Sequence, residues 1–201
     1  MPEQAFSLIP FPAPAIPEIT ITGSISRQNN LLALHYALAG HLADIFLPSP
    51  SASPSRKDEL WKTTCFEIFL GIKEQPQYWE FNLSPSGDWN AYHMDAYRRV
   101  GFREERSIQR LQVEVRKACV EPGRNEAGRF TLDTSVDLKP ILREDQLLEV
   151  GITAVIQTRD GNETYWALLH PASQADFHLR ESFILALAGQ NHPAPQSAPE
   201  S

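Results

Sequence analysis

The sequence predicts an all-β protein in which about ten antiparallel strands form two packed layers. Three observations lead to this fold class. Short alternating or apolar segments recur along the chain, many are separated by turn signals such as Asp160-Gly161, and no helical period continues beyond a turn or two. Two layers of antiparallel sheet are the economical way to bury many strands that are apolar on only one face.

Composition favours a single domain and argues against several classes of partner. With 201 residues, 42% of them hydrophobic, the chain can build one large β domain with a substantial core. Its net charge of -7 argues against nucleic acid and anionic membranes, which attract basic surfaces. Membrane-spanning and signal-peptide patterns are absent, so we expect a cytoplasmic protein whose two cysteines, Cys65 and Cys119, are free thiols.

Proline marks the boundaries of the predicted domain. Five of the sixteen prolines fall in residues 1–17, and three more fall near the C-terminus. We therefore expect a Pro-rich extended lead-in over 1–17, the β domain over 18–189 and a disordered tail over 190–201. The sequence SPSASPS at 49–55 predicts a flexible loop, of a kind that often lies at a functional site.

The expected strands share an alternation of apolar and polar residues, or a short apolar run between turns. Outside a central meander at 61–98 they are residues 18–25, 30–38, 44–47, 109–118, 129–136, 147–157, 163–169 and 182–187. The segment 147–157, LLEVGITAVIQ, is almost entirely apolar, which predicts a central strand buried on both faces. Single helical turns are expected in 138–146 and 172–180.

The aromatic stretch 61–98 organises the rest of the chain and predicts three successive strands. It holds three of the four Trp and three of the five Tyr residues. Alternation places one set of side chains in the core, namely Phe66, Ile68, Leu70, Trp79, Phe81, Leu83, Tyr92 and Met94. The opposite parity is polar and aromatic, which favours ligand binding. With Arg98 added as a counter-charge, the candidate ligand-binding residues are Glu67, Tyr78, Glu80, Asn82, Trp89, His93, Asp95, Tyr97 and Arg98.

Turn positions predict the register of this meander. A hairpin folded about residues 73–74 places Glu67 opposite Glu80. A second hairpin, folded about residues 86–87, places Glu80 opposite His93. Two opposed carboxylates repel unless they are solvated, share a proton, or hold a cation or a ligand donor between them. The simpler interpretation is the solvated face of an antiparallel sheet.

Two groups of residues resemble a bacterial group of DOMON-like proteins. The first comprises Leu60-Trp61-x-x-Thr64-Cys65-Phe66-Glu67-x-Phe69 and Tyr78-Trp79-Glu80-Phe81-Asn82-x-Ser84-Pro85-Ser86-Gly87. The second comprises His170-Pro171, Asp176-Phe177-His178 and Ser182-Phe183. The likeness spans about residues 19–188, and this group is similar to the family 9 carbohydrate-binding modules. It implies an immunoglobulin-like β-sandwich that binds sugar or haem without catalysis.

The residues leave several functions open. A carbohydrate or similar polar small molecule is the favoured ligand, because sugar recognition needs aromatic plates and charged hydrogen-bond acceptors. A protein-interaction or structural module without a small ligand is the main alternative. Haem held by Met94, or a metal held by Glu67, Glu80 and His93, is a lesser alternative, and no particular cofactor is indicated. We expect no enzymatic activity, because a carboxylate pair on a flat sheet lacks walls that exclude water.

Overall fold

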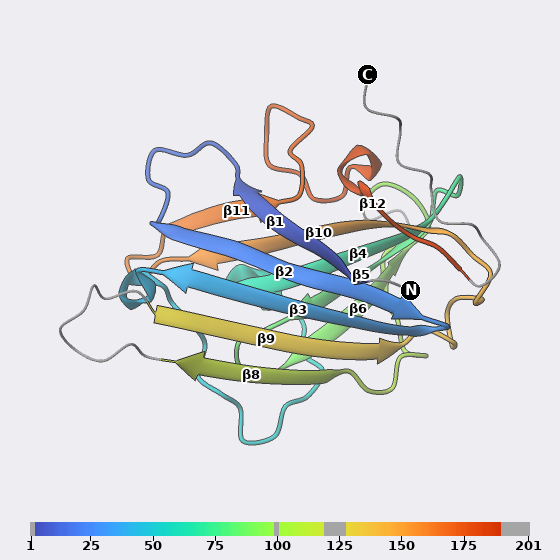
Figure 1. The fold of residues 1–201 in the computed structure, drawn as a ribbon, viewed down its shortest axis with the longest axis horizontal. Coiled ribbons are helices and arrows are strands. Elements are labelled where there is room, and N and C mark those ends of the chain that lie inside the picture. The colour runs from blue at the N-terminus through green and yellow to red at the C-terminus, as the bar shows by residue number, and fades with distance from the viewer. Residues whose placement is uncertain (1–2, 99–100, 119–127, 190–201) are drawn as a thin grey trace.

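Twelve strands and three single turns of 3-10 helix make up the described part of the protein in the computed structural model (Figure 1). The structure describes residues 3–98, 101–118 and 128–189. The strands are β1 (Gln4–Pro10), β2 (Ile19–Gln28), β3 (Leu31–Gly40), β4 (Cys65–Ile72), β5 (Tyr78–Leu83), β6 (Trp89–Met94), β7 (Arg103–Glu104), β8 (Gln112–Ala118), β9 (Gly128–Asp137), β10 (Leu148–Gln157), β11 (Glu163–Ala167) and β12 (Leu185–Leu187). The helical turns are η1 (Leu42–Asp44), η2 (Leu60–Lys62) and η3 (Arg180–Ser182). The all-β prediction is therefore confirmed.

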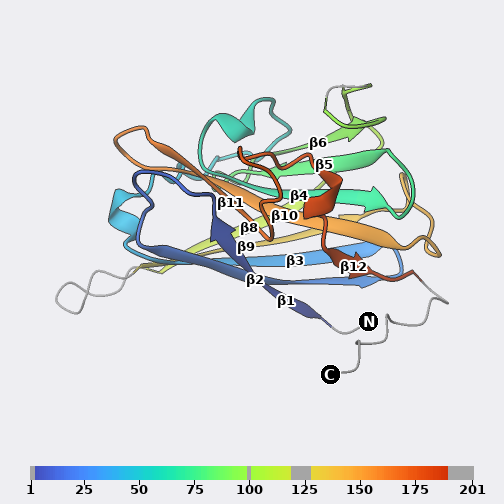
Figure 2. The same cartoon turned by 90° about the horizontal axis from the view of Figure 1, so that it is seen from above.

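One curled antiparallel sheet contains all of these strands. Its order is β7-β6-β5-β4-β10-β11-β1-β2-β3-β9-β8, and β12 pairs with β10 beside this path. Strand β1 lies at the turning point: Gln4 to Leu8 pair with β2, whereas Ile9 and Pro10 pair with β11. The segment predicted as a lead-in thus contributes a strand. Figure 2 shows that the half formed by β1, β2 and β3 lies across from the half formed by β4, β5 and β6.

The hydrophobic core fills the space between these two halves. Tyr36 of β3 packs against Phe66 of β4, with ring centroids 4.8 Å apart. Phe66 also stacks on Phe130 of β9 at 5.8 Å. The Tyr36 hydroxyl donates a hydrogen bond of 2.7 Å to the backbone oxygen of Glu67, so the halves are joined by polar as well as apolar contacts.

Strand β10 is central, as its apolar sequence predicts. It pairs with β4 on one side and with β11 on the other, and nearly all of its residues are buried.

The sequence pattern at 44–47 did not predict the local structure correctly. The short strand expected at 44–47 is the η1 turn followed by one isolated bridge at Ile45, because this segment crosses between the halves without running along a neighbour.

Several expectations concern residues outside the described ranges. The tail at 190–201 and Cys119 both belong to these residues.

Cys65 is a buried free thiol. No helix in the described part of the chain is long and apolar enough to cross a membrane.

Candidate functional site

The β4–β5 hairpin keeps the predicted faces of its side chains although its register differs. Glu67 pairs with Asn82, whereas we expected Glu67 to lie opposite Glu80. The hairpin is centred on residues 74–75 and not on 73–74, and its loop contains Glu74 in a left-handed conformation, with φ at 63°. A register change of two residues leaves each side chain on its original face, because side chains alternate with a period of two.

The β5–β6 hairpin differs by one residue, which inverts the faces of β6. Leu83 pairs with Trp89 across a five-residue loop, in which Gly87 has a φ of 88° and donates to the backbone oxygen of Ser84. Glu80 consequently lies opposite Tyr92, not opposite His93 as predicted. The predicted register corresponds to an even-numbered turn, and an odd-numbered one moves every β6 side chain to the other face.

The nine candidate residues therefore fall into three groups. Glu67, Tyr78, Glu80 and Asn82 share the outer face, which is the side of β4, β5, β6 and β10 turned away from the core. Trp89 lies on the opposite side with the core residues, and His93 shares that side, paired with Trp79. The remaining three, Asp95, Tyr97 and Arg98, follow the end of β6. Tyr97 and Arg98 both bond to Asp176 of the chain segment before η3.

Four polar residues at the centre of the outer face form what we call the carboxylate floor: Glu67, Glu80, Asn82 and Thr153. Thr153 Oγ1 donates to Glu67 Oε2 at 3.2 Å, and Asn82 Nδ2 donates to Glu80 Oε1 at 2.8 Å. The Asn82 Oδ1 atom is buried and receives no hydrogen bond from the described residues. The floor is thus rich in acceptors and poor in donors.

Burial controls the charge of the two carboxyl groups. Loss of solvent raises the pKa of Glu80 to about 7, while the hydrogen bond from Asn82 opposes that rise. The pKa of Glu67 lies well above its ordinary value, first because of burial and second because of the neighbouring charge of Glu80. Two like charges in one buried site favour retention of a proton, so the floor carries less than its full negative charge near neutral pH.

Aromatic side chains cover this face, contrary to the expectation of an open, solvated surface. Phe69, Tyr78, Tyr92, Met94 and Phe183 form a second apolar cluster there, with partly buried Trp61 and Phe177 against it. Glu67 and Glu80 retain only 3% and 6% of their surface exposed. The sequence pattern could not reveal this covering, because it comes from segments distant along the chain.

Two segments, 56–62 and 176–183, supply the covering and are called the roof. In the first, η2 packs on β4 and β5, and Trp61 meets the edge of Tyr92 with centroids 5.7 Å apart. The Tyr92 hydroxyl donates to Asp58 Oδ1 at 2.5 Å, which fixes the first roof segment to β6. The left-handed backbone of Glu59, with φ at 58°, lies between Asp58 and the η2 turn.

The second roof segment is fixed by polar contacts at His178 and Arg180. Tyr78 and His178 form a hydrogen bond of 2.9 Å between the hydroxyl and Nδ1. Burial lowers the pKa of His178 to about 4, so this imidazole is neutral and accepts the phenol proton. Arg180 donates to Glu149 Oε2 at 2.5 Å and to three backbone oxygens of the β4–β5 hairpin.

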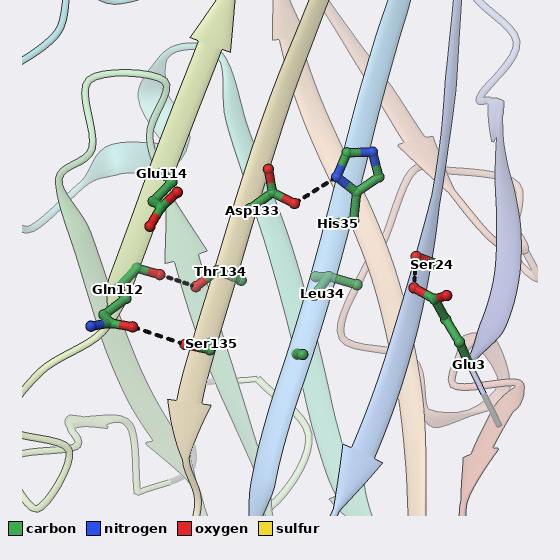
Figure 3. A pocket seen from close by; sticks show the side chains of 10 residues that line it. Glu3, Ser24, Leu34, His35, Gln112, Glu114, Asp133, Thr134 and Ser135 are labelled. Carbon is green, nitrogen blue, oxygen red and sulfur yellow. Dashed lines mark hydrogen bonds and ion pairs between the residues drawn. The ribbon is translucent and has the colours of Figure 1, made fainter. Parts of the chain in front are cut away.

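Two other hollows lie away from the carboxylate floor. One, of about 290 Å³, is on the exposed side of the other half of the sheet (Figure 3). Its polar side chains are already hydrogen-bonded within the protein. His35 Nδ1 lies 2.7 Å from Asp133 Oδ1, and Thr134 Oγ1 donates to the backbone oxygen of Gln112. The other, of about 690 Å³, is lined in part by His93 and Asp95, which places these two predicted site residues together.

The described residues offer no evident site for a metal ion or for haem, the ligands of the lesser alternatives. No group of three or more His, Cys, Asp and Glu side chains in that part of the chain could hold a metal ion. Met94, the candidate haem ligand, is fully buried in the second apolar cluster.

Comparison with known proteins identified solved structures with a similar fold. Neither a scan against protein-family models nor a search of curated proteins gave a match. Among solved structures, the chain is similar to a protein from Bacteroides uniformis ATCC 8492 suggested to bind carbohydrate, with a TM-score of 0.61 and 11% identity over 92% of this chain and 85% of that one. It is also similar to a family 9 carbohydrate-binding module from Caldicellulosiruptor kristjanssonii. With cellotriose bound, that module gives a TM-score of 0.50 and 11% identity over 94% of this chain and 84% of that one. With glucose bound, the values are 0.51 and 9% over 91% and 84%.

The chain has a fold like that of the family 9 modules. At this level of identity the likeness concerns the fold, and the site must be assessed from its own side chains. Within this family 9-like fold the carboxylate floor and the 690 Å³ pocket lie on opposite faces of β5 and β6, because Glu80 and Trp79 are adjacent in one strand.

Proposed function

We propose that the protein is a non-catalytic carbohydrate-binding module that holds a sugar, or a similar polyol, at the carboxylate floor. The observation that carries this proposal is the imbalance between acceptors and donors. Among the described residues Glu67 and Glu80 each receive one side-chain hydrogen bond, and Asn82 Oδ1 receives none. An ionised carboxylate has about four acceptor positions, so most of the floor's capacity is unused.

A polyol would supply what the floor lacks. Adjacent sugar hydroxyls donate hydrogen bonds in pairs, and bonds to a charged acceptor are roughly twice as strong as neutral ones. Such donors favour the ionised carboxylates and would release the proton that the pair retains. A cation could also balance the acids, but the described residues contain no set of ligands for one.

The roof supports the same conclusion through its aromatic rings. Trp61 and Phe177 are only partly buried, and each belongs to a segment that covers the floor. Flat apolar rings beside polar acceptors suit the two kinds of surface that a sugar ring presents. Because the floor is nearly closed, we propose that the 56–62 segment moves aside to admit the ligand, with Glu59 as its turning point.

The fold likeness supports this role, since the solved family 9 module carries cellotriose or glucose. We further propose the finer assignments that the residue motifs suggest, namely a DOMON-like protein with an immunoglobulin-like β-sandwich. The absence of catalysis also remains a proposal. It is supported by the fold likeness, since the solved neighbours are carbohydrate-binding modules or are suggested to bind carbohydrate.

Titration calorimetry with glucose and cellotriose, preceded by a glycan array, tests this proposal. We expect saturable binding that Glu80→Gln and Glu67→Gln each weaken by about tenfold or more, because each removes a charged acceptor worth ~1.5–3 kcal/mol. Glu114→Gln, at an exposed position on β8, is the matched control and should bind as the wild type does. All variants should unfold cooperatively.

Two results would contradict the proposal. If the wild-type protein binds nothing on the array, a protein-interaction or structural role becomes the better explanation. If Glu80→Gln binds sugar as tightly as the wild type, the carboxylate floor is not the site.

A further inference from the structure

The 690 Å³ pocket is a second candidate binding site, independent of the carboxylate floor. It lies on the core-facing side of β5 and β6, where Trp79 and His93 line its base. The β4–β5 loop contributes Gln75 and Gln77, and the β9–β10 connection contributes Lys139 among others. Its volume falls within the ~300–1,000 Å³ typical of small-molecule sites.

Buried hydrogen bonds hold the wall formed by the β9–β10 connection. Arg27 is 1% exposed, and its guanidinium donates to the backbone oxygens of Gln146 at 2.6 Å and Arg143 at 2.9 Å. It also donates to Asn30 Oδ1, and Asn30 in turn donates to the Leu142 oxygen at 3.2 Å. The connection therefore presents its side chains to the pocket from a fixed backbone.

The base of the pocket is equally well held. The Trp79 and His93 rings lie 4.9 Å apart, and Trp79 Nε1 donates to Glu105 Oε2 at 3.1 Å. Burial and the nearby charge of Arg103 lower the pKa of His93, so its imidazole is neutral at pH 7. His93 Nδ1 is buried 3.5 Å from Asp95 Oδ1 and has no hydrogen-bond partner among the described residues.

One cation that lines the pocket, Lys139, has no acidic partner within the described ranges, whereas the nearby acid Glu105 is bonded to Trp79 and Ser107. Asp95 is paired with Arg103 at 3.0 Å, and Arg143 is paired with Asp145 at 3.0 Å. Lys139 has no carboxylate within ion-pair distance among the residues that the structure describes. An anionic group would complete this arrangement, since it would meet the Lys139 ammonium and the guanidinium of Arg143.

The neutral side chains of Gln75 and Gln77 also line the pocket and can form hydrogen bonds with the hydroxyls of a ligand. Gln77 Nε2 donates to Gln75 Oε1, which leaves the Gln75 amide hydrogens and the Gln77 carbonyl for a ligand. One donor and one acceptor on neighbouring residues match a pair of adjacent hydroxyls.

We propose that this pocket binds a small carboxylate-bearing polyol, of the uronic-acid type. Its carboxylate lies at Lys139 and Arg143, and its hydroxyls lie toward Gln75, Gln77 and His93. This ligand differs in charge from the one proposed for the carboxylate floor, because the floor is acidic and repels anions. The protein would thus hold two ligands on opposite faces of β5 and β6.

Titration of the full chain with sodium glucuronate, followed by calorimetry and by the indole N–H resonance of Trp79, tests this inference. We expect saturable binding with a shift of that resonance, and binding of glucose at this pocket about tenfold weaker or worse, since an ion pair and its hydrogen bonds are lost. Lys139→Gln should weaken glucuronate binding about fivefold or more, and added NaCl should weaken it further. Arg116→Gln, an exposed cation on β8, is the matched control and should change nothing.

The Glu80→Gln variant separates this site from the first. Glucuronate binding should survive that substitution, even if the carboxylate floor proves to bind no sugar at all. The inference is overturned if glucuronate in the tens of millimolar produces no saturable change. It is equally overturned if Lys139→Gln binds glucuronate as the wild type does, or if Glu80→Gln abolishes the binding.

Discussion

Glu80 of β5 lies directly opposite Tyr92 of β6, and the Tyr92 hydroxyl donates to Asp58 Oδ1 at 2.5 Å. One cross-strand pair therefore connects a buried acid of the floor with the segment that covers it. It exists because the loop between β5 and β6 has five residues, which turns Tyr92 outward and His93 inward. The same loop divides the predicted site into the floor on one face and the pocket on the other.

Removal of the Glu80 carboxylate should change how stability depends on pH. Burial raises the folded-state pKa to about 7 from the ordinary value of 4.5. Between these values the folded protein binds more protons than the unfolded chain, so the contribution of Glu80 to stability is present below pH 4.5 and is lost as the pH rises through 7. The unfolding free energy of the wild type minus that of Glu80→Gln should fall by on the order of 3 kcal/mol across this window.

Urea denaturation of both proteins at several pH values measures that difference. His178, whose pKa is lowered to about 4 by burial, titrates with the opposite sign, but it is present in both proteins and cancels. Glu67 does not cancel, because the charge of Glu80 helps to raise its pKa, so the measured difference belongs to the carboxyl pair. A difference that stays constant from pH 4.5 to 7 would show that Glu80 is ionised at an ordinary pKa, and therefore solvated.

Tyr92→Phe should loosen the first roof segment. The substitution removes the hydrogen bond to Asp58 and the one that Tyr92 receives from Asn90. Asn90 retains its bond to the Lys57 oxygen, so we expect a loss of only ~1 kcal/mol in urea denaturation. If the 56–62 segment must move to admit a sugar, stopped-flow measurements should show faster association for the variant. Slower or equal association would place the route of access elsewhere.

Arg27 should be among the most sensitive charged residues of the protein. It is nearly fully buried and donates four hydrogen bonds, three to backbone oxygens and one to Asn30. Arg27→Met keeps much of the volume but leaves those acceptors unpaired, for which we expect a loss of ~3 kcal/mol or more in unfolding free energy. Arg116→Met, at an exposed ion pair, should stay within ~0.5 kcal/mol. Equal losses for the two variants would contradict the role of Arg27 in holding the pocket wall.

Cys65 should be chemically inert in the folded protein. Its side chain is fully buried, and burial followed by the charge of Glu67 raises the pKa of the thiol well above its usual value. Reaction with a disulfide reagent needs an accessible thiolate. In a Cys119→Ser background, Cys65 should react only as fast as the chain unfolds, and denaturant should accelerate the reaction. Rapid labelling under native conditions would mean that the floor beneath the roof opens readily.

The candidate site was predictable in part from single strands. Glu67, Glu80 and Asn82 share a face because β4 and β5 are regular and an even change of register preserves it. Trp89 and His93 were assigned to the wrong face, and Tyr92 was assigned to the core instead of the outer cluster. Loop length is the cause: a turn of four and a turn of five residues are equally compatible with the sequence 84–88, but they give opposite faces.

The amino-acid sequence by itself determined the all-β class, the position of most strands and the burial of β10 on both faces, because these follow from local alternation and from apolar runs. Tertiary structure alone decided that segments 56–62 and 176–183 cover the acids, and that Arg27 fixes a pocket wall more than a hundred residues away. The physical reason is the separation along the chain of the residues that make these contacts. Periodicity records which way a side chain points within its own strand, whereas covering and pocket walls depend on contacts between segments that no local pattern encodes.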